Sequence, residues 1–210
     1  MQAHATSKLT SLADLSQIVS LGFRGEAIPS IASVSRFKLT SRQADADQAW
    51  SINNALELKP AAHETGTTVD VQDLFYSTPG RRKFLKSERT EFLHIQSLLR
   101  AVALSHFSTG FNVRHNGQSM FRLAACKEDF DQRILNICGR SFLDKSQVID
   151  VEKDGMHLWG WLGTADIARS QSDRQFFYVN GRIVRDKHVN HAIRLAYADR
   201  IAAGRFPGYV

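Results

Sequence analysis

The sequence predicts an α/β protein, in which helices and strands pack as two layers. Residues 36–42 and 67–71 alternate apolar and polar side chains, in the manner of half-buried strands. Residues 91–107 instead repeat apolar side chains at three- and four-residue steps, which indicates an amphipathic helix. Asn116-Gly117 lies between two further alternating stretches and is a strong hairpin signal. Elements of both kinds therefore have apolar faces to bury against one another.

The composition narrows the class of protein. With 210 residues, 43% of them hydrophobic, the chain can hold one large domain or two small ones and is too apolar for disorder. No apolar run reaches the ~18 residues of a membrane helix, and no signal-peptide pattern is present, so we expect no membrane partner. The net charge of +6 indicates an anionic partner. Cys126 and Cys138 lack metal-ligand spacing, which favours two buried thiols in a reducing compartment over zinc.

The first element predicted along the chain is a set of short helical pieces over residues 8–19, where apolar side chains recur at helical spacing. Just before it, Thr6, Ser7 and Lys8 place two hydroxyls and a cation side by side. The simplest interpretation of the hydroxyls is an N-cap, which satisfies N–H groups of the following turn.

A glycine-bracketed segment precedes the next helix, predicted over residues 25–34. It consists of Gly22, Phe23, Arg24, Gly25 and Glu26. Glycine permits a tight turn and close approach of the backbone to a ligand. The first N–H groups of a helix have no intrahelical partner, and beside an arginine they would bind phosphate. An ordinary loop-to-helix turn is the alternative, which a lone GxxG does not exclude.

The middle of the chain is predicted to hold three strands, at residues 36–42, 50–58 and 67–71. Gly66 opens the third, in which Thr67 is interpreted, on pattern alone, as an ordinary β-branched strand residue. A basic loop follows at residues 75–89, for which a solvated charged face is the simpler interpretation. We interpret the apolar stripe of the helix at residues 91–107 as core packing. Its members are Phe92, Ile95, Leu98, Leu99 and Val102.

The composition becomes acidic after Lys127, and we expect a domain boundary there. A hairpin precedes it at residues 111–123. The elements predicted beyond it are a short helix at 134–137, a hairpin of 148–151 and 156–162, a strand at 176–179 with an Asn180-Gly181 turn, and a closing helix at 189–201.

Positive charge is concentrated in the last part of the chain. Between Arg174 and Arg205 seven basic residues stand against two aspartates. Arg182 follows a predicted turn, where we expect its side chain to project into solvent. A solvated hairpin tip and helix face is the alternative to a binding surface.

Four strings carry a family resemblance. They are HATSKL at residues 4–9, GFRGE at 22–26, GTTVDV at 66–71 running into FYSTPGRRKFL at 75–85, and YVNGR at 178–182. In this order and at these spacings, the chain from about Ala3 to Val210 resembles the MutL family of DNA mismatch-repair ATPases. The chain departs from the family pattern at Ala3, Ser77 and Gly80, where Arg, Asn and Ala are common.

The resemblance implies a fold and a division of the chain. Residues 1–127 resemble the C-terminal part of a Bergerat-type (GHKL) ATPase domain, with its lid and phosphate-binding segments. Residues 128–210 resemble the ribosomal S5 domain 2-like module that follows it, which acts as a transducer and DNA-binding domain. Both ends look cut, so we expect an internal fragment of the ATPase region.

The resemblance also assigns site residues. Those implied to bind ATP are Thr6, Ser7, Lys8, Gly22, Phe23, Arg24, Gly25, Glu26 and Thr67. Those implied to bind DNA are Arg182, Arg185, Lys187 and Arg194. No residue is implied to be catalytic, because the family's catalytic Glu and magnesium-binding Asn would precede Met1. We therefore expect that this chain alone does not turn over ATP.

The implied activity is that of an ATP-driven clamp, with ATP and Mg²⁺ as cofactors of the full-length protein. The implied partners are double- and single-stranded DNA, the mismatch-recognition protein MutS, a strand-nicking endonuclease, a helicase and a second copy in a homodimer. The implied location is cytoplasmic and nucleoid-associated.

Two other classes of function stay open on the sequence. A nucleic-acid-binding module without nucleotide chemistry would suit the basic C-terminal part but leaves residues 4–9 and 22–26 unexplained. The ATPase region of a type II topoisomerase relative would share the fold but does not predict the strings at 75–85 and 178–182.

Overall fold

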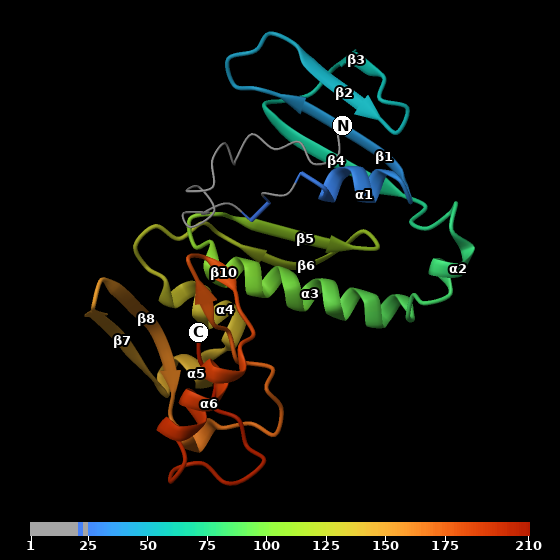
Figure 1. The fold of residues 1–210 in the computed structure, drawn as a ribbon. Coiled ribbons are helices and arrows are strands. Elements are labelled where there is room, and N and C mark those ends of the chain that lie inside the picture. Colours follow the sequence, from blue (N-terminus) through green and yellow to red (C-terminus); the bar gives the residue numbers. More distant parts are fainter. Residues whose placement is uncertain (1–20, 23–24) are drawn as a thin grey trace. The chain divides into compact units, whose positions relative to one another are not determined.

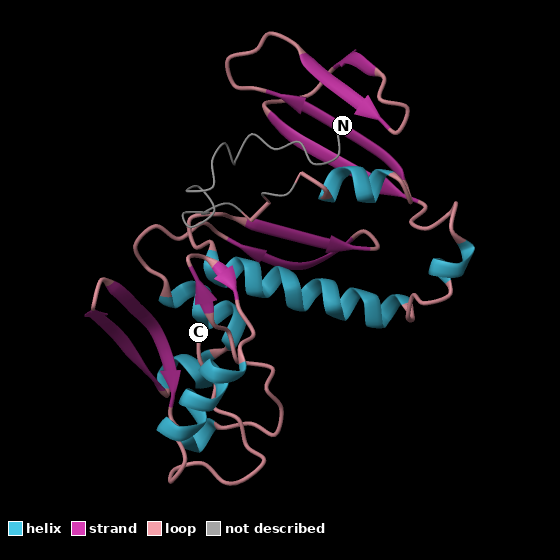
Figure 2. Cartoon of the chain, in the orientation of Figure 1, coloured by secondary structure: helices cyan, strands magenta, loops and turns pink. Residues whose placement is uncertain are grey.

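The computed structural model describes residues 21, 22 and 25–210 (Figures 1 and 2). The chain divides into two compact units, Met1–Glu91 and Phe92–Val210. The boundary near Lys127 that the sequence favours stays a prediction. Among the described residues, no helix combines the length and the apolar character needed to cross a membrane.

The first unit is built on an antiparallel sheet with the strand order β3-β2-β1-β4 (Figure 1). Its strands are β1 (Arg36–Arg42), β2 (Ala49–Asn53), β3 (Leu58–Ala61) and β4 (Gly66–Gln72). The strands predicted at 36–42 and 67–71 are confirmed. The single strand predicted at 50–58 is wrong, because the chain turns between β2 and β3. The Asn53 side chain accepts hydrogen bonds from the Ala55 and Glu57 N–H groups, and Leu56 adopts a φ of 60°.

Helix α1 (Ala27–Ala32) is the shorter form of the helix predicted at 25–34. Asn54 connects its end to the sheet. The Asn54 Oδ1 accepts a 2.6 Å bond from the N–H of the buried Phe37, while its Nδ2 donates to the carbonyls of Ser35 (2.8 Å) and Ala32. One side chain from the β2–β3 turn therefore fixes where α1 ends and β1 begins.

The second unit begins with the long helix α3 (Glu88–Ser105), whose first turn lies in the first unit. The hairpin of β5 (Phe111–His115) and β6 (Gln118–Leu123) lies along it (Figure 1). The Phe92 ring stacks on the His115 ring at 3.8 Å between centroids. Asn116 and Gly117 adopt φ of 48° and 77°, which confirms the predicted turn.

The core interpretation of the α3 stripe is wrong for two of its members. Ile95 is 51% exposed and Leu98 is 59% exposed. The residues that α3 buries are Ala101, Ala103 and Leu104, near its C-terminal end. The described part of the second unit therefore packs on the last turns of the helix and leaves the middle of its apolar stripe uncovered.

The rest of the second unit alternates short helices and hairpins. Its elements are α4 (Asp131–Cys138), α5 (Arg140–Asp144), β7 (Ser146–Lys153), β8 (Met156–Gly163), η2 (Ala165–Ile167), β9 (Tyr178–Val179), β10 (Arg182–Ile183) and α6 (Lys187–Ala196). The predicted helix at 134–137, the β7–β8 hairpin and the turn at Asn180-Gly181 are confirmed. The strand at 176–179 is shorter than predicted. The closing helix ends at Ala196, where Tyr197 leaves the helical conformation.

The core of the second unit joins α3, α4, α5 and β8. Its buried members are Leu104, Phe107, Ile134, Cys138, Phe142 and Trp161. Of the two thiols predicted to be buried, Cys138 is buried and Cys126 is only half-buried, which corrects that prediction. Tyr209 and Val210 continue the sheet beside β8, because Val210 and Trp161 exchange two backbone hydrogen bonds.

Candidate functional site

Only part of the predicted phosphate-binding segment lies among the residues that the structure describes. Gly22, Gly25 and Glu26 lie in the structure, whereas Thr6, Ser7, Lys8, Phe23 and Arg24 lie outside the described residues. Gly25 adopts a φ of 68°, in the left-handed region that favours glycine. The carbonyl of Glu26 accepts the first helical hydrogen bond from the Ser30 N–H at 3.0 Å. The segment therefore makes the tight turn into α1 that its glycines predict.

Thr67 lies at the start of β4, an edge strand of the first unit's sheet. Its hydroxyl is 2.8 Å from the Ser41 hydroxyl, and the two residues lie opposite each other in the register of β1 and β4. The Ser41 hydroxyl also donates to the Gly66 carbonyl at 3.3 Å. The structure thus describes two pieces of the predicted nucleotide site, the turn at Gly25 and a hydroxyl pair at Thr67.

The described residues can contact a nucleotide through backbone and hydroxyl groups, but they offer no metal site. Within the part of the chain that the structure describes, no group of three His, Cys, Asp or Glu side chains could hold an ion. The Mg²⁺ expected with ATP has no ligand set among these residues.

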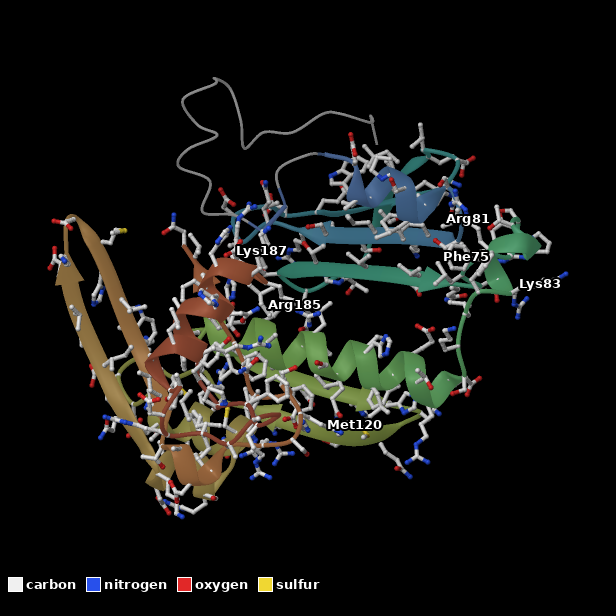
Figure 3. The ribbon with its side chains drawn as sticks, turned by 60° about the horizontal axis from the view of Figure 1, so that its bottom comes forward. Phe75, Arg81, Lys83, Met120, Arg185 and Lys187 are labelled. Atoms are coloured by element: carbon white, nitrogen blue, oxygen red, sulfur yellow. The ribbon has the colours of Figure 1, made fainter. Side chains whose placement is uncertain are left out.

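The basic loop between β4 and α3 carries α2 (Pro79–Arg82) and is fixed to the sheet at its start. The Phe75 N–H donates to the Val34 carbonyl at 2.6 Å, and Arg36 pairs with Asp73 at 2.8 Å. Arg81 and Lys83 project from the loop beyond Phe75 (Figure 3). Phe84 is 81% exposed among these cations, a detail that the charge pattern did not predict. An exposed aromatic ring beside basic side chains can stack with a nucleic-acid base.

The predicted DNA-binding residues differ in exposure. Arg182 lies in β10 opposite Val179 and is half-buried, with its Nε atom shielded from solvent. The expectation that Arg182 projects into solvent is therefore wrong for that atom, because the residue belongs to the strand rather than to the tip of the turn. Arg185, Lys187 and Arg194 are exposed. Figure 3 shows Arg185 and Lys187 together at the start of α6.

Helix α6 positions these exposed cations. Asp186 is its N-cap and accepts bonds from the N–H groups of Val189 (3.1 Å) and His188 (2.7 Å). These two backbone bonds lower the pKa of the Asp186 carboxyl. Just after the helix, the Tyr197 hydroxyl donates to the Gly163 carbonyl at 2.7 Å. Lys187 and Arg194 are seven residues apart and both exposed, so they share one solvent-facing side of α6.

The same α6 face also carries His191, four residues after Lys187, which is exposed. A row of cationic or titratable side chains on one helix face suits contacts to phosphates, which need charge and reach rather than base-specific geometry.

Comparisons of the sequence with known proteins give a consistent result. Residues 134–210 match the family model described as DNA mismatch repair protein, C-terminal domain. Over 214 residues the chain is 50% identical to the DNA mismatch repair protein MutL of Pseudomonas entomophila and 49% identical to that of Pseudomonas aeruginosa. Each alignment covers 99% of this chain and 34% of the relative. The chain therefore spans about a third of the length of these curated relatives.

Solved structures agree on the fold. The Aquifex aeolicus MutL ATPase domain complexed with ADP superimposes with a TM-score of 0.67 at 24% identity, over 95% of this chain and 75% of that one. The N-terminal domain of a DNA repair protein gives a TM-score of 0.72 at 21% identity, over 98% of this chain and 67% of that one.

The fold is thus the mixed α/β fold of a MutL-type ATPase region. The sequence identities define the family more narrowly. This chain belongs to the MutL family of DNA mismatch repair proteins.

Proposed function

We propose that this chain works in an ATP-driven mismatch-repair clamp, in which it supplies part of the nucleotide pocket and a surface for the DNA backbone. The observation that supports this most is the 50% identity to a MutL protein over 99% of the chain. ATP, when bound, supplies the phosphate contacts and the free energy that switch such a clamp. The residues of this chain bind and orient the nucleotide and the DNA backbone.

The nucleotide role rests on the turn before α1. Gly25, in its left-handed conformation, lets the backbone approach a phosphate group without a Cβ atom in the way. Thr6, Ser7, Lys8, Phe23, Arg24 and Thr67 would complete the contacts. The Aquifex aeolicus MutL ATPase domain, which is similar in fold, is complexed with ADP, and this supports a nucleotide-binding role for the chain.

The test is Gly25→Val in the whole gene product that carries this chain. A β-branched residue does not tolerate a φ of 68°, so the turn must change shape. We expect the nucleotide Kd to rise at least about tenfold, or about 1.4 kcal/mol. Gly80→Ala is the matched control, because a Cβ at Gly80 meets no atom within 4 Å. Unchanged nucleotide affinity in a folded Gly25→Val variant would show that the segment is only a turn.

The DNA role rests on Arg185, Lys187 and Arg194, with the half-buried Arg182 beside them in β10. Contacts of this kind neutralise phosphates and release counterions, so the affinity is salt-dependent and indifferent to base sequence. Both double- and single-stranded DNA offer such phosphates.

The remaining partners follow from the family. We propose that the full-length protein is a homodimer that receives a signal from MutS and passes it to a strand-nicking endonuclease and a helicase. Its proposed location is the bacterial cytoplasm, at the nucleoid. Pull-down of MutS by the whole gene product, in the presence of mismatched duplex and ATP, tests the first of these contacts.

A further inference from the structure

A polar cavity of about 500 Å³ lies in the second unit, separate from the residues assigned to nucleotide or to DNA. It is formed by three segments that are distant in sequence. Ser141 and Lys145 come from α5 and its end, Arg169, Ser170 and Arg174 from the stretch before β9, and Arg205 from the stretch after α6.

Backbone hydrogen bonds between the stretch before β9 and the stretch after α6 hold the wall of this cavity in place. Arg169 and Phe206 exchange hydrogen bonds of 2.9 and 2.7 Å, and the Tyr209 N–H donates to the Arg174 carbonyl at 2.8 Å. An Nη2 group of Arg205 donates to the Ala168 carbonyl across the same pairing. Isolated β-bridges and backbone hydrogen bonds thus hold the segments that carry these arginines.

The cavity carries more positive charge than its neighbours neutralise. Lys145 pairs with Asp166 at 2.6 Å, and the Arg169 fork pairs with Asp173 through two bonds of 2.8 and 3.0 Å. The hydrogen bond from Lys145 is the main reason why the pKa of Asp166 is lowered, so this pair is ionised. Among the described residues, Arg174 and Arg205 have no carboxylate within 4 Å. Four cations thus face two carboxylates, an excess of two charges.

This combination matches one ligand chemistry. A phosphate group carries one to two negative charges and accepts hydrogen bonds on several oxygens, and the guanidinium fork fits it in two-point geometry. Ser141 and Ser170 are exposed at the cavity and add hydroxyl donors. We propose that this cavity binds a phosphate group, with Arg174 and Arg205 as its charged contacts.

Two sources of that phosphate share this chemistry. One is a nucleic-acid backbone, since Arg205 also lines a neighbouring cavity together with Arg194 of α6. The other is free phosphate or a small phosphorylated molecule. The proposal stands whether or not Lys187 and Arg194 contact DNA.

The experiment is a titration of the 210-residue chain, labelled with ¹⁵N, with inorganic phosphate at constant ionic strength set by sodium chloride. We expect saturable shifts of the Ser141 and Ser170 amide signals. A second arm measures binding of a mixed-sequence oligonucleotide, single-stranded and as a duplex.

Variants decide the outcome. Arg174→Gln with Arg205→Gln should weaken binding at least tenfold in one or both arms. Because the half-buried Arg174 also packs in the unit, Ser170→Asp provides a second variant at an exposed position, which adds negative charge while both arginines remain. It should weaken binding by a similar factor. Arg122→Gln changes the net charge by one unit, as Ser170→Asp does, at an exposed site on β6 outside the cavity, and should change affinity less than twofold.

An effect in the phosphate arm alone assigns the site to a small phosphate, and an effect in the oligonucleotide arm assigns it to a nucleic-acid backbone. If wild-type protein shows no saturable shifts with phosphate, and the cavity variants bind the oligonucleotide as Arg122→Gln does, the proposal is overturned. If substitutions in α6 abolish DNA binding and the cavity variants bind DNA normally, the proposed DNA-binding role of α6 is supported. Only the proposed phosphate site is then refuted.

Discussion

Arg133 is a cation that the second unit buries without a carboxylate partner among the described residues. It is 1% exposed, and its guanidinium donates to the carbonyls of Ala103 (2.7 Å), Phe107 (3.2 Å), Thr109 (2.8 Å) and Ala124 (2.6 Å). The first of these carbonyls belongs to the end of α3, where the helix dipole is negative. One side chain on α4 thus connects the end of α3 to the segment after β6.

Replacing this side chain tests how much that connection contributes. Arg133→Met leaves several buried carbonyls without donors, and each such group costs about 1–3 kcal/mol. We expect the free energy of unfolding, measured with urea, to fall by at least about 3 kcal/mol. Arg133→Lys keeps some donors, so its free energy of unfolding should lie between those of the wild type and Arg133→Met. Arg122→Met, at an exposed site, serves as control. A loss below about 1 kcal/mol for Arg133→Met would mean that water replaces the guanidinium.

The two thiols should differ in reactivity. Burial raises the pKa of Cys138 to about 12, which keeps the thiol protonated at neutral pH, whereas Cys126 is half-buried. We expect iodoacetamide to modify Cys126 of the native chain at pH 8 and to leave Cys138 unmodified by mass spectrometry. Because the folded pKa exceeds the unfolded value, the stability that Cys138 contributes is complete below about pH 9 and is lost as the pH rises toward 12. Equal modification of both thiols would contradict the described burial.

At the scale of elements, α6 offers a test in which stability and DNA binding change in opposite directions. Lys187 is the first residue of α6, at the positive end of the helix dipole, so Lys187→Glu should stabilise the helix by about 0.3 kcal/mol or more. The same change should weaken binding to any duplex and flatten the slope of log K against log salt by about one to two units. The readouts are thermal unfolding and fluorescence anisotropy over a salt series.

The control for this test is charge reversal at Glu57, an exposed residue paired with Lys59 in the first unit. Glu57→Lys should leave the salt slope unchanged. Wild-type affinity and slope in Lys187→Glu would mean that the DNA surface lies elsewhere.

The elements that the sequence predicts well are those fixed by local chemistry. Asn116-Gly117, Asp154-Gly155 and Asn180-Gly181 all adopt positive φ at both positions, and each closes a hairpin where the turn signal stands. The periodicity does not predict the break between β2 and β3, because this break depends on hydrogen bonds from backbone N–H groups to the Asn53 and Asn54 side chains.

At the scale of the whole molecule, the order of four short strings was enough to predict the family, because each string serves the same fold. Exposure was harder to predict. Ile95 and Leu98 belong to a stripe with core periodicity but are exposed, and Arg182 is half-buried beside a turn. The cavity around Arg174 and Arg205 joins segments that are distant in sequence, in pairings that only the tertiary fold defines.

The central claim is that this chain does in mismatch repair what the similar segment of MutL does. A chimera tests this claim most directly. The corresponding segment of Pseudomonas aeruginosa MutL, 49% identical over 214 residues, is replaced by this chain in a strain that lacks MutL. The measurement is the frequency of spontaneous rifampicin-resistant mutants. We predict that the chimera restores a low frequency and that Gly25→Val in the chimera leaves it at the level of the MutL-deficient strain. A stably produced chimera that does not lower the mutation frequency, or a Gly25→Val chimera that lowers it as well as the parent, would contradict the account.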